Sequence, residues 1–373
     1  MILVFGATGY TGRMVVESLV SDGRDVRIAG RSQERLEKLS ARHGGLDWCV
    51  ADVKEPDSVV KAAEGASVLV TTVGPYTWWG HVAADAALHA GIPYIDITGE
   101  PGWLRKVFDE YGPRAAEAGI PMLPAIGYDY VPGNLAGALA LEAAGDAARS
   151  VDIGYFLTGE NSRSMKSLSG GTLRSLRASS SEEQFAFRGG KLVGERGAKR
   201  VITFEIGARK ATAVSIGSTE HYTLPRLAPQ LETVNAGLGW FGPASRAVSL
   251  ASALGRQAER VPGVSSVVQR LTGGQGMRDT KGTNDPSGPS EDSRAQARTN
   301  VVAVARDAGG RDIAHVHLDG PNPYDLTGKI VGWAAGQAED GSINASGAIG
   351  PVEAFGLDAL RDACAAIGLR EIQ

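Results

Sequence analysis

Cysteine and histidine are scarce in this 373-residue sequence, which contains two cysteines and six histidines. Cys49 and Cys364 lie far apart and fit neither a metal-binding nor a redox motif. We therefore expect two reduced thiols in a cytoplasmic protein. His315 and His317 alternate on one predicted strand, but no third ligand of a suitable type lies nearby, so we expect no metal site.

Long apolar runs and clusters of positive charge are also missing. No stretch of about 18 apolar residues occurs, so we expect no transmembrane helix. The 38 lysines and arginines are outnumbered by 42 aspartates and glutamates, which gives a net charge of −4. We therefore expect neither a nucleic acid nor a membrane surface as a partner. Because the first predicted strand starts at residue 2, we also expect no signal or transit peptide.

Glycine, by contrast, is abundant, with 50 residues. The apolar run MILVF (1–5) leads into the turn GATGYTG (6–12), and an amphipathic segment follows. A buried strand, a glycine-rich turn and a helix in this order are typical of the phosphate-binding corner of a dinucleotide-binding fold. We expect Gly6 to let the chain turn, Gly9 to let backbone N–H groups approach a pyrophosphate, and Gly12 to let the helix pack close to the sheet. The alternative is an ordinary tight turn.

Residues 1–126 alternate between predicted strands and helices. This order predicts an α/β domain with a doubly wound parallel sheet of Rossmann type. Ligands of such sheets bind at the carboxyl ends of the strands, so we expect the site there. The strand candidates are Ile2–Phe5, Val26–Ala29, Trp48–Ala51, Val68–Thr72, Tyr94–Ile97 and Pro121–Ile126, and the intervening helices end at Gly23, Gly44, Gly65, Gly91 and Gly119.

The end of the second strand bears on the choice of cofactor. An acidic residue about 20 positions past the glycine turn would bind the ribose 2′-OH of NAD, but Arg31 occupies this position. Arg31, with Ser32 beside it and Arg35 one turn further on, suits the 2′-phosphate of NADP. A solvated arginine is the alternative. We expect Asp52, at the end of the third strand, to lie beside the adenine.

The next three strand ends carry the candidates for the reacting half of the site. Val73 and Gly74 precede Pro75, and we expect this bend to lie over the nicotinamide. A proton must follow a transferred hydride, and a positioned acid would supply it. The candidates for this acid are Tyr76 and Tyr128, and the candidates for its orienting or polarising partner are Glu100 and Asp129. Each candidate also has a structural alternative. Tyr76 could be a packing aromatic, Glu100 could belong to the start of a helix, and Tyr128 and Asp129 could form a turn before a helix.

The pattern changes after about residue 148 and predicts a second, α+β domain with a mixed or antiparallel sheet. We place the NADP-binding domain at residues 1–130, the substrate or dimerisation domain at 131–345, and a C-terminal helix (Pro351–Ile367) that returns to the first domain at 346–373. Residues 273–292 are predicted to form a long surface loop. The strand-like runs are Ser150–Leu157, Lys199–Ile206, Thr212–Ile216, Asn300–Ala305 and Asp312–Leu318, with a hairpin signal at Gly189 and Gly190, and the candidates to clamp an anionic substrate are Arg163, Lys166, Arg174 and Arg177.

Several motifs stand in the order seen in saccharopine dehydrogenase-like proteins, and the chain most resembles the bacterial trans-acting enoyl reductases. The motifs are GATGYTGR (6–13), AGRS (29–32), TTVGPY (71–76), YIDITGE (94–100), GYDYVPGNL (127–135) and SGGT (169–172), and more loosely GPSEDSR (288–294), NPYDLTG (322–328) and GPVEAFG (350–356). One departure is clear, because family members have a small Ser and a later Asp where this chain has Tyr130 and Asn134.

This resemblance implies an NADPH-binding Rossmann domain and a second domain with a mainly antiparallel sheet. The cofactor contacts it implies are at Gly6, Thr8, Gly9, Tyr10, Thr11, Gly12, Arg31 and Ser32. The leading hypothesis is an NADPH-dependent reductase that transfers hydride to an activated C=C bond of an enoyl-type or secondary-metabolite substrate.

Two alternatives remain open. One is a saccharopine-type enzyme that acts on the C=N bond of an amino acid–keto acid adduct. The other is a non-catalytic NADP-binding sensor or scaffold. The expected partner is a small-molecule or acyl-type substrate, and a homodimer through the second-domain sheet is a further hypothesis.

Overall fold

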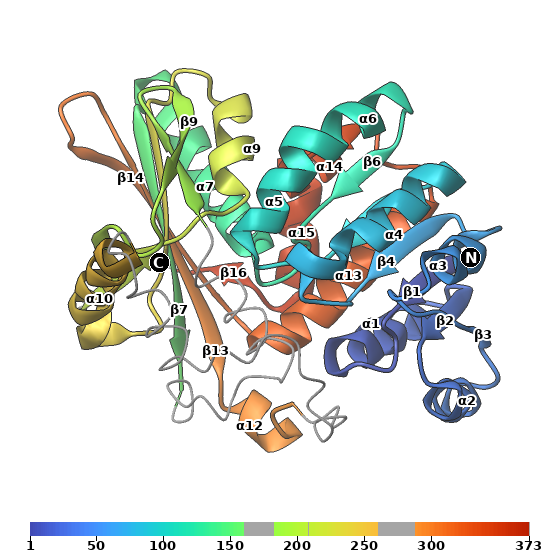
Figure 1. Cartoon of the computed structure of the whole chain (residues 1–373). Coiled ribbons are helices and arrows are strands. Elements are labelled where there is room, and N and C mark those ends of the chain that lie inside the picture. The colour runs from blue at the N-terminus through green and yellow to red at the C-terminus, as the bar shows by residue number, and fades with distance from the viewer. Residues whose placement is uncertain (160–182, 208, 260–287, 373) are drawn as a thin grey trace.

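The computed structural model describes residues 1–159, 183–207, 209–259 and 288–372. It contains two sheets, which lie on opposite sides of the molecule (Figure 1). The four basic clamp candidates, the SGGT motif and residues 273–287 of the predicted loop lie outside the described residues. Residues 291–292 of that loop belong to a short helix, α12 (Glu291–Ala295).

The first sheet is parallel throughout, as predicted. Its strand order is β15-β6-β5-β4-β1-β2-β3. All six predicted strands are present, and the seventh, β15, comes from the C-terminal part of the chain and pairs with β6. The strands are β1 (Ile2–Phe5), β2 (Val26–Gly30), β3 (Asp47–Val50), β4 (Val68–Thr71), β5 (Tyr94–Asp96), β6 (Pro121–Leu123) and β15 (Gly347–Ala348).

The predicted helices of the first domain end where the glycines are. Gly23, Gly44, Gly65, Gly91 and Gly119 all have φ between 69° and 81°, a conformation that glycine adopts without a Cβ penalty. The helices are α1 (Tyr10–Ser21), α2 (Gln33–Arg42), α3 (Pro56–Ala63), α4 (Tyr76–Ala90), α5 (Pro101–Lys106) and α6 (Gly112–Glu117), with a π-helical turn at Val107–Tyr111 between the last two.

The second sheet is mixed and mostly antiparallel, which confirms the predicted fold class. Its main strand order is β10-β11-β12-β7-β13-β14-β16, and only β12 and β7 run parallel. The β8–β9 hairpin turns at Gly189 and Gly190 as predicted, whereas β12 was not predicted. The strands are β7 (Ser150–Thr158), β8 (Gln184–Arg188), β9 (Lys191–Glu195), β10 (Val201–Ile206), β11 (Arg209–Ser215), β12 (Thr233–Leu238), β13 (Arg298–Arg306), β14 (Asp312–Gly320) and β16 (Arg370–Glu371).

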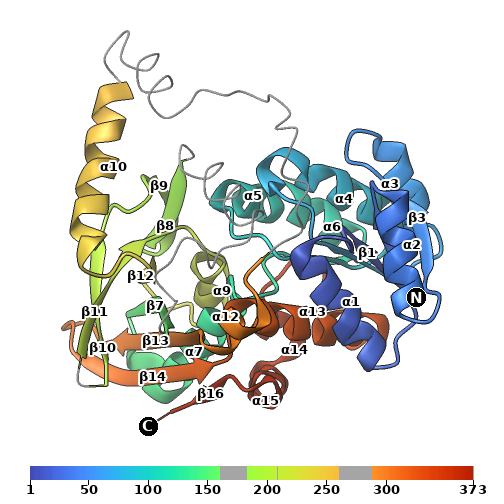
Figure 2. The ribbon, with the colours of Figure 1, turned by 90° about the horizontal axis from the view of Figure 1, so that it is seen from below.

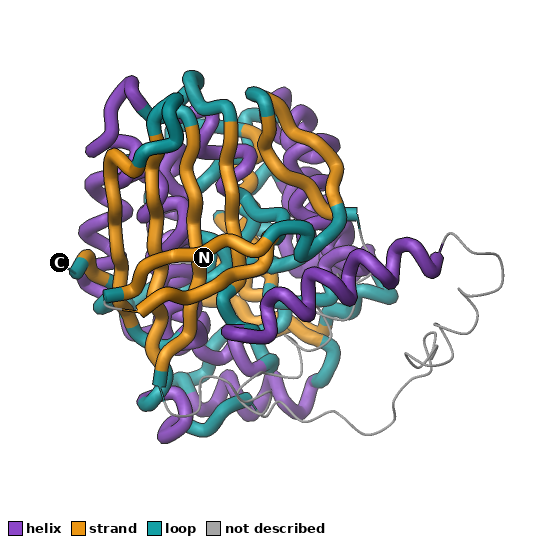
Figure 3. Tube along the Cα trace, turned by 90° about the vertical axis from the view of Figure 1, so that its left-hand side faces the viewer, coloured by secondary structure: helices purple, strands orange, loops and turns teal. Residues whose placement is uncertain are grey.

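Helices cover mainly one face of this second sheet (Figure 3). Helix α7 (Val131–Ala144) packs against β7, β13 and β14, and its residues 131–141 are all buried. Helix α9 (Glu220–Leu227) packs against α7, and α10 (Ser245–Glu259) lies against β10 and β11. No helix within the described residues is both long and apolar enough to cross a membrane.

The C-terminal part of the chain returns to the first domain through α13 (Pro323–Glu339), which lies beside α1 (Figures 1 and 2). Gly328, Gly332 and Gly336 recur every four residues and form one face of α13. A Cβ on Gly332 would lie 2.4 Å from Ser18 Oγ, and one on Gly328 would lie 2.8 Å from Met14 Cβ. The two helices approach closely because these side chains are missing. The predicted domain boundaries, which place α13 in the second domain, stay a prediction.

The prediction of one continuous helix over Pro351–Ile367 is wrong. The segment forms two helices, α14 (Pro351–Phe355) and α15 (Leu357–Ile367), separated by Gly356. The backbone of Gly356 has φ 80° and ψ 155°, which no residue inside a helix adopts. Both helices pack against α7, and α15 also packs against α13.

Candidate functional site

The glycine-rich turn has the close backbone contacts that its sequence predicts. Gly6 has φ 89°, and the Gly9 N–H donates to the Gly6 carbonyl at 2.9 Å. A Cβ on Gly12 would lie 2.3 Å from the Gly6 carbonyl oxygen, and one on Gly6 would lie 2.7 Å from Thr72 Oγ1. Both distances are too short for any side chain, so the turn requires glycine at these positions.

The N-terminus of α1 suits an anionic group. Gly9 is its N-cap residue, no side chain caps its free N–H groups, and its first turn carries no acidic residue. Free N–H groups and the helix dipole favour a phosphate at such a position. The cradle formed by the glycines and the helix end therefore fits the pyrophosphate of a dinucleotide. Thr8 and Thr11 belong to this segment.

The loop after β4 lies against the same turn. Thr72 Oγ1 donates to the Gly6 carbonyl at 3.1 Å, and Val73 Cγ2 lies 2.8 Å from where a Cβ on Gly6 would be. The structure therefore brings Val73, with Gly74 next to it, to the glycine turn, as the parallel order of β1 and β4 requires.

Several arginines lie where the adenosine half of the cofactor is expected. Arg31 is exposed after β2, and Ser32 is the N-cap residue of α2 without a side-chain capping bond. Burial lowers the pKa of Arg13, and the charges of Arg42 and Arg35 lower it further. Arg13 therefore lies near two other arginines, and sequence analysis missed it although it ends the GATGYTGR motif.

The Asp52 side chain forms a hydrogen bond within its own loop. It follows β3, and its Oδ1 accepts from the Lys54 N–H at 3.0 Å, so its carboxylate supports a local turn. The structure places it after the strand next to β2, as the sequence predicted.

The side chain of Tyr10 connects the cofactor corner to the C-terminal half of the chain. Its hydroxyl donates to the Pro289 carbonyl at 2.7 Å and accepts from Arg294 Nη1 at 2.7 Å. Its ring meets the ring of Tyr324 edge-on at 5.1 Å, and Arg294 pairs with Asp325 at 2.9 Å. The GPSEDSR and NPYDLTG motifs therefore converge on the first residue of α1.

Tyr76 and Glu100 are brought together, but in a structural arrangement. The Glu100 carboxylate accepts from the Tyr76 N–H at 2.9 Å and from the Thr77 N–H at 2.8 Å, so it caps the N-terminus of α4. The Tyr76 hydroxyl donates to the Thr71 carbonyl at 3.0 Å, and the side chain is 4% exposed. These contacts favour the structural alternatives for both residues.

Asp96, at the end of β5, organises this edge of the sheet and was not predicted as a site residue. It is fully buried and accepts four hydrogen bonds within 3.0 Å. The donors are the Thr98 and Ala125 N–H groups, the Tyr94 hydroxyl and Trp103 Nε1. Asp96 thereby joins the ends of β5 and β6 and positions the loop that carries Tyr128 and Asp129.

Tyr128 is buried with an unsatisfied hydroxyl. Its ring lies 5.6 Å from that of Tyr155 and 6.5 Å from that of Trp240. Within the part of the chain that the structure describes, neither the Tyr128 hydroxyl nor Trp240 Nε1 has a hydrogen-bond partner. Burial raises the pKa of Tyr128. An unpaired buried hydroxyl is costly, and a polar group of a ligand would satisfy it.

Asp129 lies beside the backbone of Gly99. A Cβ on Gly99 would lie 2.8 Å from Asp129 Oδ2, so a side chain at position 99 would displace this carboxyl group. Burial, and then the charge of Glu220, raise the pKa of Asp129 to about 7. A carboxyl group with this pKa gains and loses its proton near neutral pH.

Glu220 and Tyr155 belong to the same polar cluster and were missed by sequence analysis. Glu220 is fully buried at the start of α9, and the Tyr155 hydroxyl, from β7, donates to its Oε1 at 2.5 Å. Burial raises the pKa of Glu220 to about 7. No local sequence signal connects residues 129, 155 and 220, because only the tertiary fold brings them together.

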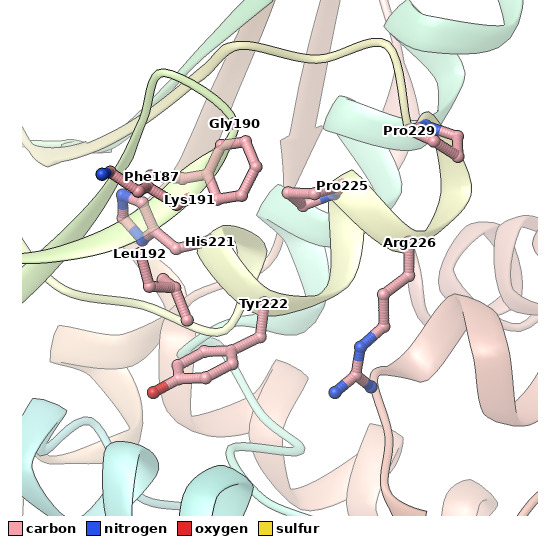
Figure 4. Close-up of a pocket in the computed structure, with 9 residues that line it drawn as sticks. All are labelled: Phe187, Gly190, Lys191, Leu192, His221, Tyr222, Pro225, Arg226 and Pro229. Atoms are coloured by element: carbon pink, nitrogen blue, oxygen red, sulfur yellow. The ribbon is translucent and has the colours of Figure 1, made fainter.

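A shallow hollow of about 440 Å³ lies between α9 and the β8–β9 hairpin (Figure 4). None of the predicted site residues lines it, so it does not belong to the predicted site. Burial lowers the pKa of His221, one of its lining residues, to about 3, which keeps that imidazole neutral. Among the described residues no cluster of histidine, cysteine or carboxylate side chains is arranged to hold a metal ion. The hollow is lined by Phe187, Gly190, Lys191, Leu192, His221, Tyr222, Pro225, Arg226 and Pro229.

Known proteins resemble this chain in sequence and in fold, and the sequence matches cover parts of the chain. Residues 6–92 match the sequence profile of an NAD(P)H-binding family. A trans-acting enoyl reductase of Mycobacterium tuberculosis is 39% identical over 140 residues, which are 36% of this chain and 34% of that protein. A second M. tuberculosis protein named as an enoyl reductase of this type is 39% identical over 184 residues, 47% of this chain and 43% of its own length. A lipid droplet localized protein of Caenorhabditis elegans is 34% identical over 146 residues, 36% of this chain and 34% of that protein.

The whole chain shares its fold with a solved structure. Saccharopine dehydrogenase (L-Glu forming) from Saccharomyces cerevisiae superposes with a TM-score of 0.60 and 16% identity, over 100% of this chain and 99% of that one. The predicted resemblance to saccharopine dehydrogenase-like proteins and enoyl reductases is therefore confirmed. The sequence matches span less than half the length of each curated relative above.

The close contacts in the glycine turn lead to a prediction about cofactor binding. In Gly12→Ala the new Cβ would collide with the Gly6 carbonyl oxygen. This oxygen belongs to the backbone and cannot move aside as a side chain can, so the glycine turn itself must change its conformation. We expect NADPH to bind about tenfold more weakly or worse, as measured by its fluorescence, since overpacking of about 1–3 kcal/mol acts directly on the phosphate cradle.

Gly23→Ala is the control for general destabilisation. Gly23 has φ 71°, and no atom lies within 4 Å of a Cβ placed there. The substitution therefore strains the backbone at a position that is remote from the phosphate cradle. Equal loss of NADPH binding in the two variants would contradict a specific role for the turn.

Proposed function

We propose that this protein is an NADPH-dependent reductase that transfers hydride to an activated C=C bond of an enoyl-type substrate. The observation that carries the proposal is the position of two features at one edge of the parallel sheet. The glycine turn follows β1, and the loop with Asp129 follows β6, with β4 and β5 between them. Parallel strands end at the same edge, so a dinucleotide held after β1 extends toward that loop.

The first domain supplies the groups that would hold the cofactor. The α1 N-terminus and the glycine backbone would bind the pyrophosphate. Arg31 and Ser32, with Arg13 and Arg35 nearby, would bind a 2′-phosphate by charge-assisted hydrogen bonds. When bound, a nicotinamide cofactor supplies the hydride.

The junction of the two domains supplies the groups for proton transfer. Reduction of an enoyl group leaves a carbanion-like carbon that needs a proton, and an acid is most effective when its pKa lies near the working pH. Asp129, with a pKa of about 7, meets this condition. The Tyr128 hydroxyl, which has no hydrogen-bond partner among the described residues, would donate to the substrate carbonyl and polarise the double bond. These roles are the reverse of those that the sequence predicted, in which a tyrosine was the acid and Asp129 its partner.

The sequence relatives favour a C=C substrate over a saccharopine-type adduct, because two of them are named trans-acting enoyl reductases. An adduct of an amino acid and a keto acid carries carboxylates that need arginine or lysine clamps. The four basic residues that sequence analysis offered as such clamps lie outside the described residues. Reduction of C=N remains the second candidate, because the fold is shared with saccharopine dehydrogenase.

NADPH consumption against a panel of substrates tests the proposed reaction. The panel contains enoyl thioesters, unsaturated aldehydes, and imines formed from keto acids and amines. We expect oxidation of NADPH with enoyl thioesters and none with the imines. Turnover of the imines alone would overturn the C=C assignment, and binding of NADPH without turnover of any panel member would favour a sensor or scaffold.

The choice of NADPH over NADH is tested by Arg31→Asp. The loss of a charge-assisted contact and the gain of a repulsive carboxylate should weaken NADPH binding about 10- to 100-fold. NADH has no 2′-phosphate, so its binding should be unchanged or improved. Lys38→Asp makes the same charge change at an exposed position of α2 and should have little effect. An unchanged NADPH/NADH ratio in Arg31→Asp would show that Arg31 does not select the cofactor.

Asp129→Asn tests the proton donor. The amide keeps the shape of the carboxyl group but cannot deliver its proton, so kcat at pH 7 should fall about 10²- to 10⁴-fold while NADPH affinity stays the same. In the native enzyme kcat should fall as the pH rises through about 7, because Asp129 then loses its proton. Asp57→Asn, at an exposed position of α3, is the control. Full activity of Asp129→Asn would require a different acid.

A further inference from the structure

We propose that Tyr10 links cofactor binding to the segment that leads into β13, and that Arg294 is the positioning residue of this link. The backbone N–H of Tyr10 belongs to the phosphate cradle, whereas its side chain is held by residues 288–294 and by α13. The identity of the cofactor in this inference rests on the proposed function. Sequence analysis expected Tyr10 to contact the cofactor and gave Arg294 no role of its own.

The Tyr10 hydroxyl is paired as a donor and as an acceptor. It donates to the Pro289 carbonyl at 2.7 Å and accepts from Arg294 Nη1 at 2.7 Å. Burial raises the pKa of this hydroxyl, which therefore keeps the proton that its bond to Pro289 requires. A hydrogen bond from a guanidinium is charge-assisted and stronger than one between neutral groups. The hydroxyl is thus used within the protein and is not available to a cofactor.

The Tyr10 ring is enclosed by two further segments. A Cβ on Gly288 would lie 2.5 Å from the ring atom Cε2, so the backbone of residue 288 lies directly against the ring. The ring also meets that of Tyr324, near the start of α13, edge-on at 5.1 Å. The first residue of α1 therefore cannot shift without displacing residue 288 or the start of α13.

Arg294 joins the first turns of two helices. Its guanidinium donates to the Tyr10 hydroxyl of α1 and pairs with Asp325 of α13 at 2.9 Å. The Arg294 side chain is 20% exposed, so solvent screens these contacts only in part. One side chain from the segment before β13 thereby fixes the beginning of α1 relative to the beginning of α13.

The two helices begin side by side, but only one of them is capped by a side chain. The glycine face of α13 meets α1 in the order of the sequence, from Met14 to Ser18, so both helices run in the same direction. The Asn322 side chain caps α13 by accepting from the N–H groups of residues 324 and 325. No side chain of the described residues caps α1. The α1 end is therefore the one that suits a phosphate.

A phosphate at α1 and the contacts of the Tyr10 side chain depend on the position of the same residue. When two binding events favour the same position, each strengthens the other by the same factor. We therefore expect NADPH to bind more weakly when the bond between Tyr10 and Arg294 is lost. We also expect the segment 290–297 to be held more firmly when NADPH is bound.

Titration of NADPH by its fluorescence tests the link without any substrate. Tyr10→Phe removes one hydroxyl group and no charge, and Arg294→Gln removes the donor to that hydroxyl. Each change should weaken NADPH binding about 5- to 10-fold, which is typical of coupling between sites. The double variant should bind NADPH about as weakly as Arg294→Gln alone, because both changes break the same bond. Losses that multiply in the double variant would overturn the positioning role of Arg294.

Arg24→Gln is the matched control. Arg24 follows α1 and pairs with Asp340, the C-cap residue of α13, at 2.5 Å, so it joins the same two helices at their other ends. Its loss should leave NADPH binding unchanged. Equal weakening in Arg24→Gln and Arg294→Gln would mean that Arg294 only stabilises the contact between the helices, which would overturn the proposal.

Arg294→Lys tests whether the hydrogen bond to Tyr10 is what matters. Lysine keeps a charged donor, so this variant should retain more affinity for NADPH than Arg294→Gln, and an equal loss would contradict the role of the bond. Tyr10→Phe removes a single oxygen atom and decides the proposal if the Arg294 variants do not fold. Native affinity for NADPH in Tyr10→Phe would overturn it.

Hydrogen exchange tests the link in the opposite direction. Saturating NADPH should slow amide exchange in residues 290–297 of the native protein, and the slowing should be much smaller in Tyr10→Phe. Binding of NADPH without any slowing in the native protein would overturn the link.

Failure of the proposed function gives a different result. A native protein that binds NADPH and reduces no member of the substrate panel would contradict the proposed reaction, while both tests of the link would still apply. Turnover of enoyl thioesters together with unchanged NADPH affinity in Tyr10→Phe would contradict the link alone.

Discussion

The four hydrogen bonds to the Asp96 carboxylate are the interaction on which the rest of the site depends. They join backbone N–H groups after β5 and β6 to side chains from β5 and α5. Because the loop after β5 leads to Glu100 and the loop after β6 leads to Asp129, one buried carboxylate positions both the cap of α4 and the proposed acid. The four donors satisfy the buried carboxylate and hold the two loops beside each other.

The first domain is completed by segments from the far end of the chain. Strand β15 extends its sheet, the glycine face of α13 lies against α1, and Arg294 bonds to the side chain of Tyr10. The last contact joins the first residue of α1, at the phosphate cradle, to the segment that leads into β13 of the second sheet. The cofactor corner and the second domain are therefore one connected structure.

The sequence predicted what is encoded locally and missed what depends on distant contacts. A strand, a glycine turn and a helix form from neighbouring residues, and so the six strands and the glycine corner were predicted correctly. Tyr76 and Glu100 were predicted as catalytic candidates because they follow strands, but a sequence cannot show that a carboxylate caps a helix 24 residues away. Glu220 carries no local signal, because its burial results from α7 and β7 packing around it. The break at Gly356 was missed because the apolar spacing continues across it.

The same distinction explains why the cofactor is easier to infer than the substrate. A dinucleotide is bound largely by backbone groups of one turn and one helix end, which a short motif specifies. The proposed acid, by contrast, lies on the loop after β6, and the Tyr155–Glu220 pair comes from β7 and α9. Only the tertiary fold brings these side chains together, and a motif search does not detect such contacts.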